Sequence, residues 1–214
     1  MKLMENILFI GEGALLTLEL VLAGMSVGLL LGALLAIVRY KGWMVFVINR
    51  FISIMRGTPV ILQLSFVYFA IPSALGISMN VLCAGIITLG LNSSAYIAEI
   101  LRAGIESLPK GQFEASQALR IPSWLMWKDI ILPQVIKNIF PALINELISL
   151  LKETALISTL GGMDLMRRAQ AIASEQYTYF APICIAGCYY YLLILMVEWI
   201  AKMIEKRSSY VKHA

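Results

Sequence analysis

The sequence predicts an all-α membrane protein with five transmembrane helices and one short helix outside the membrane. Three observations support this fold class. Of the 214 residues, 60% are hydrophobic and only 14% are charged. The mean hydropathy is +0.82. The apolar residues gather in five stretches, each long enough to cross a bilayer. A soluble domain of this size needs a largely polar surface, whereas side chains that face lipid are free to be apolar.

The predicted spans contain small and helix-breaking residues at informative positions. Gly24, Gly28 and Gly32 recur every four residues in the first span, a pattern that lets another helix approach closely. In the second span, Gly57-Thr58-Pro59 predicts local unwinding of the helix. The five predicted spans are residues 13–38, 43–72, 81–101, 130–151 and 181–201.

The positions of the lysines and arginines predict the orientation in the membrane. Thirteen of the 17 lie on the cytoplasmic side if the N-terminus is outside and the C-terminus is inside. Only Lys2, Lys152, Arg167 and Arg168 then lie outside. We therefore expect this orientation. The thirteen inner cations are Arg39, Lys41, Arg50, Arg56, Arg102, Lys110, Arg120, Lys128, Lys137, Lys202, Lys206, Arg207 and Lys212.

The composition favours one domain over residues 1–214 and predicts no cofactor. We find no repeat, no low-complexity linker and no nucleotide-binding G-x-x-x-x-G-K-[ST] pattern. Glu5 and Glu12 interrupt the N-terminal apolar run, so we expect no cleaved signal peptide. The single histidine, His213, and the cysteines form no metal-binding pattern. We interpret the cysteines as small helix-packing residues; they are Cys83, Cys184 and Cys188.

A short helix is predicted on the cytoplasmic side, between the third and fourth spans. Pro109 and Gly111 end the preceding helix, and a new helical pattern covers residues 112–121. Pro122 ends this pattern, and we expect Ser123 to cap the next helix. The small side of the short helix suits docking into a protein groove. That side is formed by Ala115 and Ala118 or Ser116.

The segment around this short helix resembles the EAA motif of ABC importer permeases. Glu114-Ala115-Ser116 is followed after three residues by Arg120, and after nine more by Ile130-Ile131-Leu132-Pro133. The usual motif has Ala at position 116 and Gly at position 120. Glycine permits a backbone conformation that arginine disfavours, so Arg120 changes the expected exit from the helix.

Further matches narrow the resemblance to permeases for polar amino acids, similar to the histidine, arginine and glutamine permeases. They run in order from Arg56-Gly57-Thr58-Pro59 and Gln63, through Ala95-Tyr96-Ile97-Ala98-Glu99, to Lys152-Glu153-Thr154-Ala155-Leu156. The resemblance implies a non-catalytic permease of the type I importer fold in the bacterial inner membrane. Two permease subunits, identical or different, would rest on two ATPase subunits and receive substrate from a periplasmic or lipoprotein binding protein. The implied ATPase-coupling residues are Gln112, Glu114, Ala115, Ser116, Leu119 and Arg120.

Polar residues within the fourth span are candidates for substrate binding, because charges at membrane depth usually mark a pathway or a pair. Glu146 follows Pro141, which removes a backbone hydrogen bond and favours a cavity. A carboxylate here suits a cationic side chain or an α-ammonium group. Lys152 would then bind an α-carboxylate, with Asn145 beside them. Alternatively, Glu146 and Lys152 pair with each other or with neighbours, although a direct pair requires the helix to end between them.

A second polar cluster, Asn92-Ser93-Ser94, lies in the third span and joins Thr58 as a set of candidate substrate-binding residues. The alternative is that such serines only bond the preceding helical carbonyls. Arg56 and Glu99 both lie near the cytoplasmic ends of their spans. For these two residues we expect a structural ion pair.

The external segment 163–176 reads as a surface helix with one apolar face, formed by Leu165, Ala169 and Ile172. Arg167 and Arg168 are expected to turn away from that face. The helix either covers an outer gate and contacts a substrate-delivery protein, or lies in the membrane interface.

The sequence thus predicts an ATP-driven importer of a polar, cationic L-amino acid such as arginine, lysine or histidine. Glutamine or another polar amino acid is the alternative substrate. An ion-coupled secondary transporter is a more distant alternative, since it usually has more spans or paired repeats. A membrane enzyme would need a nucleophile with a base, or a metal cluster, at membrane depth.

Overall fold

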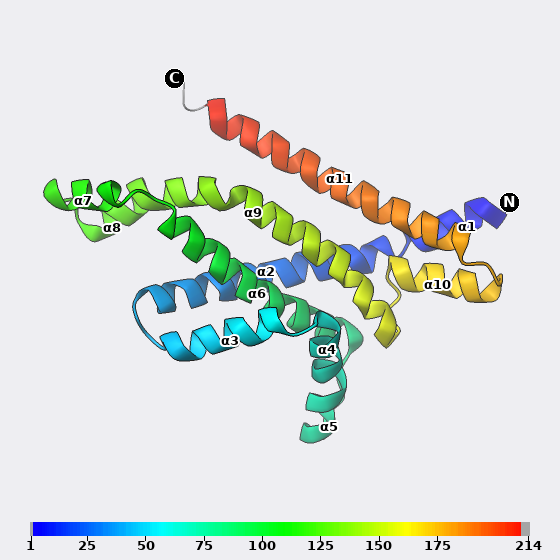
Figure 1. Cartoon of the computed structure of the whole chain (residues 1–214). Coiled ribbons are helices and arrows are strands. Elements are labelled where there is room, and N and C mark those ends of the chain that lie inside the picture. The colour runs from blue at the N-terminus through cyan, green and yellow to red at the C-terminus, as the bar shows by residue number, and fades with distance from the viewer. Residues whose placement is uncertain (1, 211–214) are drawn as a thin grey trace.

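Helices that run lengthwise through one bundle form the structure, which is a computed structural model that describes residues 2–210. Helix α1 (Lys2–Gly11) and α10 (Leu165–Glu175) lie at one end, and α7 (Lys110–Ala118) and α8 (Ser123–Leu125) lie at the other (Figure 1). Helix α1 and the last turns of α11 (Phe180–Tyr210) lie at opposite ends of the bundle (Figure 1). Lys212 and His213, used in the sequence analysis, lie outside the described residues.

Four helical stretches in the described chain are long and apolar enough to cross a membrane, which confirms four predicted spans. Each extends beyond its predicted boundaries, because helices continue past the apolar run into the polar ends of the bundle. The first stretch also includes α1, which was not predicted. The stretches are α1 with α2 (Ala14–Tyr40), α6 (Val81–Glu106), the Ser123–Leu160 helix, and α11 (Phe180–Tyr210) as far as Lys206.

The Ser123–Leu160 helix changes its winding along its length. After α8 comes a π-helical segment, η2 (Met126–Ile131), then α9 (Leu132–Glu153) and a 3₁₀ segment, η3 (Thr154–Leu160). Pro141 lies inside α9, where the missing N–H removes one backbone hydrogen bond of the helix.

The second predicted span is broken. Helix α3 (Val45–Gly57) ends at the predicted Gly-Thr-Pro break, and the chain resumes in α4 (Val60–Ser65), η1 (Phe66–Ala70) and α5 (Ile71–Leu75). The two parts meet at an angle of 106°. The expected unwinding at Gly57-Thr58-Pro59 is therefore confirmed, and the bend divides the second predicted stretch into two helical parts. Thr58 and Pro59 are extended, since proline lacks the N–H that the helix needs.

Helices α2 and α6 pack against each other through the predicted glycine stripe. A Cβ added to Gly28 would lie 2.7 Å from Cβ of Ser93, and one added to Gly32 would lie 2.8 Å from Cβ of Ile97. Gly90 of α6 takes part from the other side, where an added Cβ would lie 2.6 Å from Cγ1 of Val27. The two backbones can approach this closely only because these side chains are absent.

The short helices differ from prediction in detail. Helix α7 spans 110–118 rather than 112–121, because the chain leaves the helix at Leu119. Ser123 is the first residue of α8 and not its cap: the cap position is Pro122, which has no side-chain hydrogen bond to offer. The cysteines are exposed in the isolated chain, so their interpretation as helix-packing residues is not supported within this subunit.

Helix α10 has the predicted apolar face. Leu165 and Ala169 are completely buried and Ile172 nearly so. Arg167 is exposed as expected, but Arg168 is not turned away from the protein. Its guanidinium donates to the Glu12 carboxylate at 2.6 Å and stacks over the Phe9 ring, which ties α10 to α1.

Adding a methyl group to the glycine stripe should destabilise the fold. We expect Gly28→Ala to lower the melting temperature of the purified protein in detergent, because the new Cβ overlaps Ser93 and overpacking costs about 1–3 kcal/mol. Gly187→Ala is the matched control, since a Cβ there meets no atom within 4 Å. Equal melting temperatures for the two variants would contradict the close contact between α2 and α6.

Candidate functional site

The break between α3 and α4 is held together by amide side chains. Pro59 has no N–H, so the Met55 carbonyl one turn earlier loses its helical donor. Gln63 Nε2 donates to that carbonyl at 2.8 Å, and Asn92 Nδ2 of α6 donates to it at 3.2 Å. Asn92 also donates to Gln63 Oε1 at 3.1 Å. Two amides thus replace the missing backbone bond and anchor the break to α6.

Thr58 takes part in the same network. Its hydroxyl donates to the Ile54 carbonyl at 2.8 Å and accepts from Gln63 Nε2 at 2.9 Å. Since Thr58 is extended, its own N–H no longer points along the helix, and the hydroxyl takes the place of that donor. The structure therefore brings two predicted substrate residues, Thr58 and Asn92, together through Gln63.

The candidate carboxylate, Glu146, lies beside the glycine contact. Ser93 of α6 donates to Glu146 Oε1 of α9 at 2.6 Å. Ser93 is buried, and Glu146 is partly buried. The neighbouring Ser94 hydroxyl instead donates to the Leu91 carbonyl of its own helix at 2.7 Å, which is the alternative that we considered for these serines. Helix α6 thus presents its polar residues to different partners.

Asn145 and Lys152 are exposed in the isolated chain. Helix α9 is continuous through Glu146 and Lys152, so the helix end that a direct pair requires is missing. Among the described residues, no lysine or arginine forms an ion pair with Glu146. The two residues lie about 9 Å apart along the axis of α9, on different faces of the helix.

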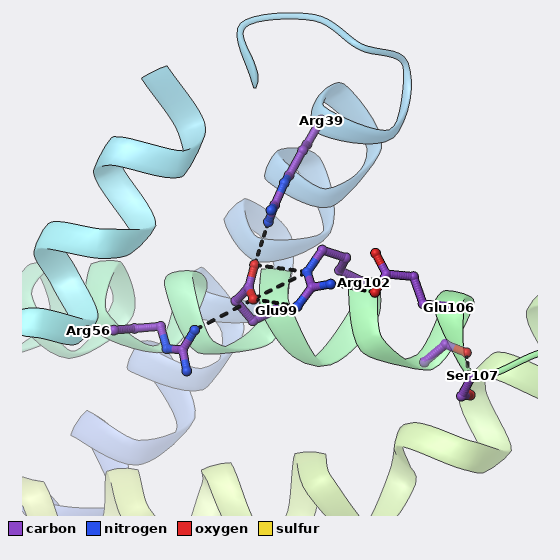
Figure 2. Close-up of polar contacts among 7 residues, drawn as sticks. Arg39, Arg56, Glu99, Arg102, Glu106 and Ser107 are labelled. Carbon is purple, nitrogen blue, oxygen red and sulfur yellow. Dashed lines mark hydrogen bonds and ion pairs between the residues drawn. The ribbon is translucent and has the colours of Figure 1, made fainter. Parts of the chain in front are cut away.

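Glu99 lies at the centre of a charge cluster that joins three helices. The expected pair with Arg56 is present at 3.6 Å, and Arg102 approaches Glu99 at 2.9 Å. Arg39, at the end of α2, also donates to Glu99, while Arg102 bonds Glu106 as well (Figure 2). One carboxylate thus links the ends of α2, α3 and α6 on the side of α7.

Helix α7 is anchored by aromatic packing. The Phe113 ring meets Trp127 edge-on at 6.3 Å, and Trp127 meets Tyr40 of α2 at 5.0 Å. Glu114, Ala115, Ala118 and Leu119 remain exposed, and Gln112 is partly buried. Ser116 differs from the other predicted coupling residues because it is 2% exposed, and its hydroxyl donates to the Gln112 carbonyl.

Arg120 adopts the backbone conformation of the glycine that the motif usually has. Its φ is +52°, in the left-handed region. The Arg120 N–H donates to the Gln117 carbonyl and the Ile121 N–H donates to the Ser116 carbonyl, both at 2.9 Å. These two bonds define a Schellman motif, in which the left-handed position normally favours glycine. Arg120 therefore stands at a left-handed helix-end position that favours glycine, at the expense of local strain.

Asp164 is a buried carboxylate that the sequence analysis did not single out. It caps α10 by accepting from the Arg167 N–H at 2.8 Å, and it accepts from the Tyr190 hydroxyl of α11 at 2.9 Å. Burial raises the pKa of this side chain, although its hydrogen bonds act in the opposite direction. The sequence did contain a signal for Asp164, because an aspartate directly before a helical pattern is a typical helix cap.

Gln63 and Arg39 were also overlooked as site residues. Gln63 was noted only as part of the family resemblance, and Arg39 only as a cation for orientation. Gln63 bonds Asn92 and Arg39 bonds Glu99, and both of these partners on α6 lie far away in the sequence, which local spacing does not show.

These features agree with the comparison to known proteins. The chain belongs to the family of binding-protein-dependent transport system inner membrane components, whose model matches residues 28–210. A putative glutamine transport system permease of Rickettsia typhi is 52% identical over 208 residues, 96% of this chain and 95% of the relative. The arginine transport system permease of Bacillus subtilis is 42% identical over 201 residues, 93% of this chain and 92% of that protein.

Solved structures support the same assignment. A chain of an amino acid ABC transporter crystallised with histidines is 35% identical and has a TM-score of 0.88, covering 96% of this chain and 97% of that one. An inward-facing methionine ABC transporter, at 20% identity and a TM-score of 0.69, shares the fold.

This protein is therefore a membrane-spanning permease subunit of an amino acid ABC importer, as the sequence motifs indicated. The family is non-catalytic. Its members work with an ATPase and a substrate-binding protein. Membership decides against the ion-coupled transporter and the membrane enzyme that we considered as alternatives.

Restoring the motif glycine should stabilise the protein. We expect Arg120→Gly to raise the melting temperature by a few degrees, because the left-handed conformation costs a non-glycine residue about 1–2 kcal/mol. Arg167→Gly, an exposed position within α10, should lower it, since glycine inside a helix costs about 1 kcal/mol. A lower melting temperature for Arg120→Gly would count against the strain that we assign to this turn.

The Asp164 carboxyl should make stability depend on pH. Because its pKa is raised in the folded state, the fold binds this proton more tightly than the unfolded chain does. Its contribution is therefore present at acid pH, below the ordinary pKa of about 3.9. It is lost as the pH rises through the raised pKa. We expect the melting temperature of the wild type to fall over this range relative to Asp164→Asn.

Asn keeps an oxygen for the Arg167 N–H and an amide for the Tyr190 hydroxyl, so the fold should persist in this variant. Asp129→Asn, at an exposed aspartate, is the control, and its melting temperature should change with pH as that of the wild type does. If the melting temperatures of the wild type and Asp164→Asn change with pH in parallel, the pKa of Asp164 is the same in the folded and unfolded states.

Proposed function

We propose that this permease forms the translocation path for a cationic L-amino acid such as arginine, lysine or histidine. The observation that supports the proposal is the environment of Glu146. Its carboxylate lies in a membrane helix, accepts one hydrogen bond from Ser93, and has no cationic partner among the described side chains. An ionised carboxylate without a cation is unfavourable at membrane depth, and a cationic substrate would supply the missing partner.

Lys152 and Asn145 complete the proposed substrate site on the same helix. Both are exposed in the isolated chain, and both are therefore available to a ligand. Lys152 would bind the α-carboxylate, while Glu146 would bind the side-chain cation or the α-ammonium group. Asn92, Ser93, Ser94 and Thr58 would support the site. Ser93 orients Glu146, and Thr58 and Asn92 belong to the network at the helix break.

Helix α7 would couple ATP hydrolysis by the partner ATPase to transport. The exposed residues Glu114, Ala115 and Leu119 would contact the ATPase, with Leu119 74% exposed at the end of the helix. Ser116 and Gln112 would fix the helix from within, and the turn at Arg120 would set its exit. Two permeases over two ATPase subunits would place α7 on the cytoplasmic side, with the N-terminus outside. The inner membrane of a bacterium is the expected location.

Glutamine is the second candidate substrate. The Rickettsia typhi relative is named as a glutamine permease, and the Bacillus subtilis relative as an arginine permease. The two named substrates differ in the charge at the end of the side chain, and Glu146 would distinguish them by that charge.

Replacing Glu146 should separate the two candidates. The permease is reconstituted in liposomes with its partner ATPase and binding protein, and ATP hydrolysis is measured with arginine, lysine, histidine or glutamine. We expect cationic amino acids to stimulate the wild type. Glu146→Gln should weaken that stimulation about tenfold or more, because a buried charge pair loses one partner. Glu205→Gln, an exposed position on α11, is the control.

Stimulation by glutamine alone would leave the importer in place and remove the cationic specificity. Unchanged stimulation by arginine in Glu146→Gln would show that Glu146 does not select the substrate. Direct uptake of labelled arginine checks both results independently of ATP hydrolysis.

A further inference from the structure

A groove on the surface of the bundle, close to α7, lies apart from the proposed substrate site. It has a volume of about 410 Å³ and lies among α2, α6, η2 and α9. Its walls are almost entirely apolar. They include Ala33, Ala36, Ile37, Leu101, Leu132 and Val135.

A second, charged hollow adjoins this groove. It has a volume of about 330 Å³, and Arg39, Arg102 and Glu106 line it. Ala36, Tyr40 and Ile105 line both spaces, so the apolar groove and the charged hollow share a wall. Lys41 lies at the mouth of the apolar groove.

The charges at this end are unbalanced. Glu99 and Glu106 are the only carboxylates in the ion-pair cluster, and Arg39, Arg56 and Arg102 surround them (Figure 2). Lys41 adds a further cation, whose ammonium group lies 5.5 Å from the Trp43 ring centroid. The region therefore keeps a net positive charge after every internal pair is formed, and an anion complements it.

Exposed aromatic side chains indicate the depth of the groove in the membrane. Tyr40, Trp43 and Trp124 are 58%, 64% and 62% exposed at this end of the bundle. Tyrosine and tryptophan gather at the level of the lipid headgroups. The apolar groove thus begins at headgroup depth and extends along the hydrocarbon-facing side of α2.

We propose that an anionic phospholipid of the leaflet on the α7 side binds here. One acyl chain occupies the apolar groove, and the phosphate lies beside Lys41, Arg39 and Arg102. Basic pockets between membrane helices are known to suit acidic lipid headgroups, whereas a zwitterionic headgroup brings its own cation into the same cluster. The proposal does not depend on which amino acid the importer carries.

The site also has a connection to α7. Trp127 lines the groove and packs between Tyr40 and Phe113. A bound acyl chain would therefore support the wall that holds α7 in place.

Native mass spectrometry of the purified complex of permease and ATPase tests the proposal. The complex is titrated with phosphatidylglycerol or phosphatidylcholine of the same acyl chains. We expect tighter binding of phosphatidylglycerol, and we expect Lys41→Gln to weaken it about fivefold. Lys2→Gln removes the same charge at the opposite end of the bundle and should have no effect. Lys41 is exposed, so its replacement leaves the core intact.

A second pair of variants tests the groove itself. Ala36→Phe fills the shared wall without changing charge and should weaken binding of phosphatidylglycerol, whereas Leu34→Phe, on an exposed part of α2, should not. Equal binding of the two lipids, equal effects of Lys41→Gln and Lys2→Gln, or no lipid on the assembled complex would each overturn the proposal. These outcomes leave the amino acid specificity untouched.

Discussion

The close packing of α2 on α6 is the contact on which the rest of the structure depends. Inside a bilayer, no hydrophobic force drives one helix against another, so van der Waals contact between backbones has to hold them. The missing side chains at Gly28, Gly32 and Gly90 make that contact possible. Ser93 lies within it and donates to Glu146, so α9 is positioned relative to the same contact. The candidate carboxylate is thus placed by packing as much as by polar bonding.

Two polar groups inside the bundle, the Met55 carbonyl and the Glu99 carboxylate, have partners on other helices. The Met55 carbonyl, freed by Pro59, accepts from Gln63 and Asn92, and Glu99 collects arginines from α2, α3 and α6. Since an unpaired polar group in lipid costs several kcal/mol, such partners are required wherever the helix is interrupted or charged. Glu146 stands out against this pattern, because a single serine hydroxyl is its partner.

The sequence predicted the features that local pattern controls. Four apolar helices long enough to span a membrane, the glycine stripe, the break at Pro59 and the Arg56–Glu99 pair were predicted from spacing or residue type, and the structure contains them. The partners that Gln63, Arg39 and Arg168 find could not be predicted, since each lies far away in the chain or on a helix that was not expected. The roles of Glu146, Lys152 and the exposed residues of α7 remain predictions, because they concern molecules outside this chain.

The doubly bonded carbonyl of Met55 has a consequence for how this family can change over time. With two donors on one acceptor, loss of either amide leaves the carbonyl bonded, whereas a single donor would leave it bare at about 1–3 kcal/mol. The Met55 carbonyl therefore keeps a hydrogen bond when one of the two amides is replaced. The tolerance is greater at position 63 than at position 92, because loss of Asn92 would leave the buried Gln63 Oε1 without the donor that it has in this structure.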